Sequence, residues 1–135
     1  ATPAVSFKTD VLPVFQRSCG LSTACHGDSS MPFQDRPYFG PNKMVTATAD
    51  DITKILAGSV GVQSALEPGM MIVKAGDPEN SFLMYKLDGQ VQCSKLSCAD
   101  SKGCGTLMPQ GSTDPLAENE RDAIRRWVAQ GAANN

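Results

Sequence analysis

The spacing of apolar residues predicts four helices along the chain. The first covers residues 6–19 and presents one apolar stripe, with polar side chains on its other face. The stripe consists of Phe7, Val11, Val14 and Phe15. A proline costs about 3 kcal/mol inside a helix, so Pro13 is expected in a first turn capped by Asp10, in a helix that is kinked or begins near Val11. This helix leads directly into Cys19.

Three further helices are predicted by helical spacing together with caps, N1 prolines and closing glycines. Their expected limits are Thr48 or Asp50 to Gly58, Asp77-Pro78 to Gly89, and Asp114-Pro115 to Gly131. Loops that contain several glycines and prolines lie between the helices, at 27–48, 58–76 and 89–113. Unstructured loops longer than about 12–15 residues are uncommon in compact domains unless something orders them. The sequence therefore predicts an all-α domain with long ordered loops.

The length and composition are those of a single domain, 1–135, with few aromatic side chains for its core. The 135 residues include only five Phe, two Tyr and one Trp. A buried cofactor with a large apolar ring would supply core that the side chains lack. The net charge is −2 and no run of like charge occurs, so neither nucleic acid nor an anionic membrane is an expected partner. No stretch approaches the ~18 apolar residues of a membrane span.

A cysteine directly precedes the only histidine of the chain, at Cys25-His26. A Cys-His pair is the second half of the attachment motif of c-type haem, in which two thiols add to the porphyrin and the imidazole binds the iron. The first thiol would be Cys19. It lies before Cys25 with five residues between them, where about two are usual. The longer insert must bulge outward to bring both sulfurs over one porphyrin.

Two other interpretations of this motif remain open from its residues alone. One is a scaffold of disulfides with an incidental histidine. The other is a structural zinc site made of Cys19, Cys25, His26 and a later cysteine. Zinc ligands usually occur in pairs roughly two to four residues apart at both ends. The later cysteines do not show that spacing well: Cys93, Cys98 and Cys104.

The number of cysteines indicates an oxidising compartment. The chain has 5 cysteines, and c-type haem is likewise attached outside the cytosol. We therefore expect a periplasmic or extracellular protein. Residues 1–4 lack the basic and apolar regions of a signal peptide, so we expect either a removed signal peptide or a module of a longer secreted protein.

Taken in order, the motifs resemble those of class I c-type cytochromes. They are an N-terminal helix, Cys-x5-Cys-His-Gly at 19–27, interior helices, Leu-Met-Pro at 107–109, and a closing helix that ends in Trp-Val-x-x-Gly-Ala. The resemblance covers nearly the whole chain. It implies a cytochrome c-like helical fold, in which the first and last helices cross and one covalently attached haem lies between helices and loops.

The resemblance also implies which residues attach the haem. Cys25 corresponds to the second thioether, and Cys19 corresponds to the first if the longer gap is allowed. His26 corresponds to the proximal ligand of the iron. Because the chain has 1 histidine, ligation by two histidines is excluded.

Met108 corresponds to the distal iron ligand of the family. Pro109 agrees with this role, because a proline holds the preceding residue in an extended conformation. Met70 or Met71 is the alternative sixth ligand. His/Met ligation raises the reduction potential and closes the iron to substrates, so we expect a small electron carrier with an unidentified redox partner protein.

Two alternative functions remain open at this point. A labile sixth ligand would suit a peroxidase-like or ligand-binding haem domain. Such an enzyme needs a distal acid–base group, which an arginine or a carboxylate would have to provide in the absence of a second histidine. The other alternative is a non-haem interaction domain stabilised by disulfides.

The odd number of cysteines leaves their pairing open. In one scheme, Cys19 and Cys25 both hold haem, two of the three later cysteines form a disulfide, and one thiol is free. In the other scheme, only Cys25 holds haem and the remaining cysteines form two disulfides, which avoids a reactive free thiol. The resemblance favours the first scheme, with a disulfide from Cys104 to Cys93 or Cys98.

Overall fold

The computed structural model describes residues 3–30, 36–67, 69–91, 96–98, 103–111 and 114–135. The helical elements are η1 (Phe7–Val11, a π-helical turn), α1 (Leu12–Ser18), α2 (Ala49–Ala57), η2 (Pro78–Asn80, a 3-10 turn), α3 (Phe82–Asp88) and α4 (Glu118–Ala129). Loops with isolated β-bridges connect them, and the residues described contain no β-strand. The predicted helical fold class is therefore confirmed for this part of the chain.

The first predicted helix is present and begins at Phe7, inside the predicted stretch 6–19 and not near Val11. Ser6 is its N-cap, because the Ser6 hydroxyl accepts a hydrogen bond from a backbone amide at 3.2 Å. Asp10, the expected cap, lies inside the first turn and accepts from the Ser6 amide at 2.8 Å. The Leu12 amide donates to the Phe7 carbonyl, which widens the helix just before Pro13. The π-helical turn thus precedes the residue that has no amide to donate.

The second predicted helix, α2, is confirmed and has Thr48 as its cap. The Thr48 hydroxyl accepts from the Asp51 amide at 3.1 Å, and the Asp51 carboxylate accepts from the Thr48 amide at 2.8 Å. This reciprocal capping box satisfies two amides at the start of the helix. Gly58 follows the last helical residue, as the sequence predicts.

The helix predicted from Asp77 onward is divided in two. Pro78–Asn80 form a single 3-10 turn, and α3 begins only after Ser81. The division arises because the first two amides of α3 donate to the carbonyls of residues 71–72, at 2.9 and 3.0 Å, and not to the preceding turn. Gly89 ends α3 with a φ of 71°, in the left-handed conformation expected of a closing glycine.

The last helix, α4, begins at Glu118, later than the predicted start after Asp114. Leu116 packs against the core just before the helix. The Leu116 carbonyl accepts from the Arg121 side chain at 3.0 Å and not from a helical amide. Tertiary packing therefore overrides the local start signal of an aspartate followed by a proline.

An aromatic cluster forms the core where η1 and α1 pack against α4. The ring centroids of Phe7 and Trp127 lie 5.1 Å apart, and those of Phe15 and Trp127 lie 6.3 Å apart. Phe39 extends the cluster, with its ring 4.8 Å from Phe15. All four side chains are buried. Their contacts remove a large apolar area from water and hold the first and last helices together.

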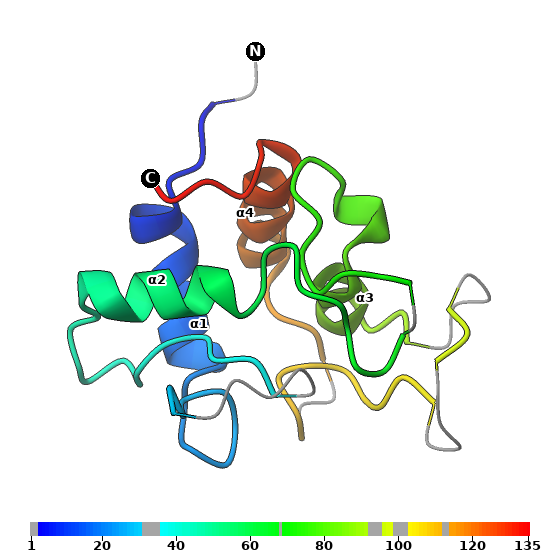
Figure 1. Ribbon diagram of the computed structural model, residues 1–135, viewed down its shortest axis with the longest axis horizontal. Helices are drawn as coiled ribbons and strands as arrows, with labels where there is room; N and C mark the ends of the chain where they lie inside the picture. The colour runs from blue at the N-terminus through cyan, green and yellow to red at the C-terminus, as the bar shows by residue number, and fades with distance from the viewer. Residues whose placement is uncertain (1–2, 31–35, 68, 92–95, 99–102, 112–113) are drawn as a thin grey trace.

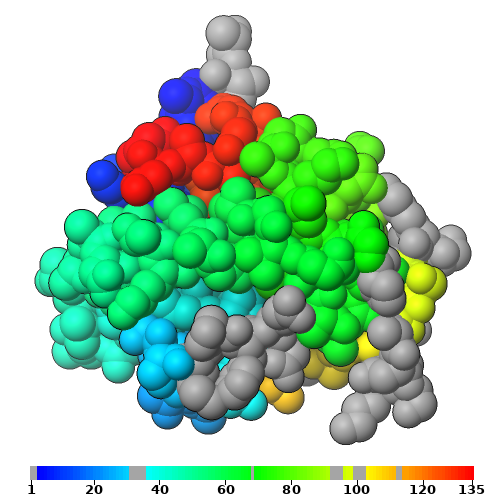
Figure 2. Space-filling model, viewed as in Figure 1, coloured from blue at the N-terminus to red at the C-terminus, as the bar shows by residue number. Residues whose placement is uncertain are grey.

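The two termini lie at one end of the molecule, and the 19–27 loop and the 103–111 segment lie at the opposite end (Figure 1). A backbone hydrogen bond of 3.0 Å from Lys8 to Asn135 joins the two terminal segments. Figure 2 shows the residues of α2 and the segment after it crossing the face between these two ends. None of the helices in the described part of the chain is long and apolar enough to cross a membrane.

Replacing Trp127 by alanine should lower the free energy of unfolding by about 3–5 kcal/mol, because it removes a buried indole from the aromatic cluster. Urea unfolding followed by circular dichroism measures the change. Met44→Ala is the control, since Met44 is 83% exposed and its truncation should change stability by less than ~0.5 kcal/mol. Equal effects of the two substitutions would show that the cluster is not the core.

Candidate functional site

A cavity lies between the 19–27 loop, α3 and the segment that contains Met108. Its volume is about 270 Å³, and it is open to solvent. The buried part of its wall is mainly apolar, with Phe39, Ile72, Phe82, Leu83 and Leu87, and it also contains Ser64 and Lys86. All the residues predicted as haem ligands line it: Cys19, Cys25, His26 and Met108. The fold thus brings together residues that are far apart in the sequence.

The insert between the two cysteines forms a compact loop whose ends are held together. The His26 amide donates to the Cys19 carbonyl at 3.2 Å, which closes the loop. Inside it, the Ser22 carbonyl accepts from the Cys25 and Gly27 amides, each at 3.0 Å. Residues 21–24 are exposed. The insert therefore bulges outward, as the sequence predicts for a motif with a longer gap.

Two glycines allow this loop to pack closely against neighbouring backbone. A Cβ atom at Gly20 would lie 2.4 Å from the Gly40 carbonyl oxygen, and one at Gly27 would lie 2.9 Å from the Ser22 carbonyl oxygen. Real Cβ atoms do not approach backbone atoms that closely. A side chain at either position would therefore displace the loop that carries Cys25 and the histidine.

Both cysteines of the motif carry free thiols, and their environments differ. Cys19 is buried, whereas Cys25 is half-buried and accepts from the Ser22 hydroxyl at 3.7 Å. Burial, with a smaller contribution from the neighbouring Cys25, raises the pKa of the Cys19 thiol to about 12. Cys19 is therefore a protonated thiol at neutral pH, inside an apolar wall.

His26 is oriented by one hydrogen bond and one ring contact. Its Nδ1 lies 2.8 Å from the Pro37 carbonyl oxygen, which can only accept, so Nδ1 carries the proton. The imidazole ring packs against Phe39 with the ring centroids 5.1 Å apart. Burial lowers the pKa of His26, and the hydrogen bond to Pro37 opposes this only in part. The result is a neutral imidazole whose Nε2 is left with a lone pair, the form in which histidine binds metals.

Met108 lies in the cavity wall and is held by the backbone of α3. Its amide donates to the Lys86 carbonyl at 3.0 Å, and its side chain is half-buried. The alternative ligands Met70 and Met71 do not line the cavity, and Met71 is 39% exposed. Met84 is buried in the core. Of the methionines that the structure describes, Met108 is the one that lines the same cavity as His26.

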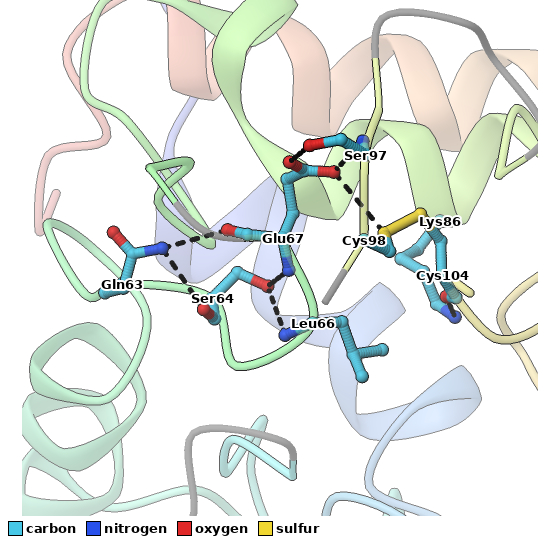
Figure 3. Close-up of a disulfide and its surroundings, with 8 residues drawn as sticks. All are labelled: Gln63, Ser64, Leu66, Glu67, Lys86, Ser97, Cys98 and Cys104. Atoms are coloured by element: carbon cyan, nitrogen blue, oxygen red, sulfur yellow. Dashed lines mark hydrogen bonds between the residues drawn. A yellow bond between two sulfur atoms is a disulfide. The ribbon is translucent and has the colours of Figure 1, made fainter. Parts of the chain in front are cut away.

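A disulfide joins Cys98 to Cys104, with 5.3 Å between their Cα atoms (Figure 3). This confirms one of the two pairings expected for Cys104; Cys93 lies outside the described residues. The Glu67 carboxylate lies against the disulfide and accepts from the Ser97 amide at 2.6 Å and from its hydroxyl at 3.0 Å. Although Glu67 and both sulfurs are close together, the sulfurs are bonded to each other. The cluster therefore offers no thiolate to a metal.

The Cys98–Cys104 disulfide also argues against the zinc interpretation. A zinc site at Cys19, Cys25 and His26 requires a later cysteine as its fourth ligand. The later cysteines that the structure describes, 98 and 104, are joined to each other. Within this part of the chain, no cysteine is left to complete a zinc site.

The sequence did not identify Glu67 and Lys86 as residues of this region. Glu67 stands in a turn and Lys86 on a helix, and both residue types are usually exposed in such places. Here both are buried. The run of apolar residues around Lys86, from Phe82 to Leu87, is the signal that could have indicated a helix buried on all sides.

No protein-family model matches the chain, and no curated protein or solved structure matches it. The chemistry of the site therefore follows from its own residues. These are the free thiols of Cys19 and Cys25, the neutral imidazole of His26, which is held through Nδ1, and the thioether of Met108. All of them line one cavity whose buried wall is mainly apolar.

The chain without a bound cofactor should lose stability as the pH falls through the titration of His26. Burial lowers the pKa of His26 in the folded chain. At pH values between this lowered pKa and ~6.5, the unfolded chain therefore binds a proton that the folded chain does not bind. The free energy of unfolding should therefore decrease from about pH 7.5 towards about pH 5.5, as measured by urea unfolding. His26→Asn, which keeps an N–H donor for Pro37 but does not titrate, should show a smaller decrease. The same decrease in both proteins would contradict the assignment.

Proposed function

We propose that this chain is a mono-haem c-type cytochrome domain that transfers single electrons. The observation that carries the proposal is the meeting of Cys19, Cys25, His26 and Met108 in one apolar cavity. Two thiols with an imidazole and a thioether form the donor set of covalently bound haem with His/Met ligation. An apolar cavity of this extent suits a large flat ring better than a single metal ion.

The two thiols would attach the porphyrin. Each thiol would form one thioether bond by addition of its S–H across a vinyl group, with no other reactant consumed. The hydrogen bond between His26 and Cys19 keeps the ends of the motif together although five residues separate Cys19 from Cys25. Because residues 21–24 bulge outward, the five-residue gap is compatible with attachment of one haem through both cysteines.

His26 and Met108 would provide the axial ligands of the iron. The imidazole would bind through Nε2, because Nδ1 is engaged by the Pro37 carbonyl. Such a hydrogen bond to the second nitrogen fixes the ring and makes it a stronger ligand. The thioether of Met108 would favour the ferrous state and exclude small substrates from the iron. A haem bound here would supply a one-electron couple.

The lining of the cavity favours electron transfer over peroxide chemistry. A peroxidase needs a distal group that can accept and return a proton. Among the described residues that line the cavity there is no carboxylate, and the histidine is assigned to the iron. The charged side chains there are Arg36 and Lys86, of which only Arg36 is of a residue type that the peroxidase-like alternative could use.

The Cys98–Cys104 disulfide supports an oxidising compartment, so we place the protein in the periplasm or outside the cell. Its partner would be another redox protein. Because electron transfer requires approach to the cavity, the exposed residues at its mouth would form the contact. They include Leu21, which is 52% exposed.

The purified protein should show the visible bands of haem c, and these should respond to a reductant. Met108→Ala should keep the haem attached but convert the iron from a low-spin to a high-spin form and lower its reduction potential, because the soft axial thioether is lost. Absorption spectra and a redox titration measure both effects. Met70→Ala and Met71→Ala are the controls and should leave the spectrum unchanged.

A colourless protein would disprove the proposal, and an unchanged spectrum of Met108→Ala would disprove the sixth ligand. The wild type should exchange electrons rapidly with small redox mediators and turn over little peroxide. Strong peroxidase activity of the native protein would instead favour a labile sixth ligand.

Intact mass after thiol alkylation tests the attachment through Cys19. With two thioethers and the Cys98–Cys104 disulfide, one cysteine, Cys93, should be alkylated without prior reduction under denaturing conditions. Reduction should raise the number to three. If no cysteine is alkylated before reduction and four are alkylated after it, Cys19 takes part in a disulfide and holds no porphyrin.

A further inference from the structure

Lys86 brings a basic side chain into the wall of the cavity. Only 8% of the residue is exposed, and it lies on α3 among apolar neighbours. Its Nζ donates a hydrogen bond to the Cys104 carbonyl at 2.8 Å, beside the disulfide (Figure 3). The amine is therefore held at a defined position beside the cavity and does not extend into water as lysines usually do.

No described carboxylate forms an ion pair with Lys86. Glu67 lies near the same disulfide, but its carboxylate accepts from the amide and the hydroxyl of Ser97. Burial leaves the charge of Lys86 poorly solvated and therefore lowers its pKa. A buried ammonium that no carboxylate of the described residues neutralises is costly. Added negative charge in the cavity would offset that cost.

Lys86 and His26 line the same cavity. Charges interact more strongly in a poorly hydrated interior than in water, and salt screens them less there. A group bound in the same cavity as His26 would therefore experience the field of Lys86.

We infer that Lys86 raises the reduction potential of the haem in this cavity, an inference that rests on the proposed function. Reduction adds one electron to the iron, and no bond is made or broken. The charge of the site falls by one unit in this step. A positive charge fixed nearby stabilises the reduced form relative to the oxidised form and so makes reduction more favourable.

Backbone contacts fix this charge relative to the sixth ligand. The Lys86 carbonyl accepts from the Met108 amide at 3.0 Å, so one residue of α3 positions both the ammonium and the ligand segment. Gly105 leaves room for the amine, because a Cβ atom there would lie 2.9 Å from Nζ. Lys86 is thus a positioning and charge-bearing residue and not a ligand.

The test compares Lys86→Gln with the wild type by redox titration of the intact haem protein. Glutamine removes the charge but keeps an N–H donor for the Cys104 carbonyl. At a fixed ambient potential, the ratio of reduced to oxidised protein should fall about tenfold, a shift of ~59 mV for a one-electron couple. Lys86→Arg should keep the wild-type ratio. Lys43→Met, which removes an exposed lysine, should change the ratio by less than about twofold.

An unchanged ratio in Lys86→Gln, with the haem spectrum intact, would overturn this inference and leave the proposed function standing. A fall that occurs only together with loss of the low-spin spectrum would also overturn it, because Lys86 would then act by holding Met108 in place. If Lys86→Gln does not fold, Lys86→Met provides the same comparison with an apolar side chain of similar length. A wild-type protein without haem would instead overturn the proposed function itself.

Discussion

A continuous row of aromatic contacts connects the core to the cavity. It runs from Trp127 on α4 through Phe15 on α1 and Phe39 to the imidazole of His26, with ring centroids 6.3, 4.8 and 5.1 Å apart. The Phe39 amide also donates to the His26 carbonyl at 2.8 Å. The position of the histidine therefore depends on the same packing that joins the first and last helices. Because interiors of this kind are closely packed, a change in the core is transmitted to the site.

The segment that carries Met108 is held by a different set of interactions. Its position is fixed by the Cys98–Cys104 disulfide, by Glu67 and by the two hydrogen bonds of Lys86 on α3. A disulfide restricts the unfolded chain, and hydrogen bonds satisfy polar groups that would otherwise be buried without partners. These contacts hold the described residues of the 89–113 loop in place, and they bring Met108 to the cavity.

The helix boundaries show how far local sequence signals extend. The closing glycine at Gly89 was predicted correctly, and Thr48 was one of the two caps predicted for α2, because each acts on the backbone of a single helical turn. The aspartate–proline pairs at Asp77 and Asp114 carry a similar signal, yet the helices begin later in both cases. In both cases hydrogen bonds or packing with residues outside the predicted helix displaced its start. Such contacts cannot be read from the segment itself.

For the site, the sequence by itself determined the residue types and the local motif, namely a cysteine next to the only histidine and a methionine before a proline. It left open which methionine lies near His26 and which cysteine pairs with Cys104, and it did not indicate that Lys86 is buried. Only the tertiary structure decided these points. The physical reason is that periodicity and capping act over a few residues. A shared cavity, a disulfide and a buried charge depend on segments far apart in the chain that meet only after folding.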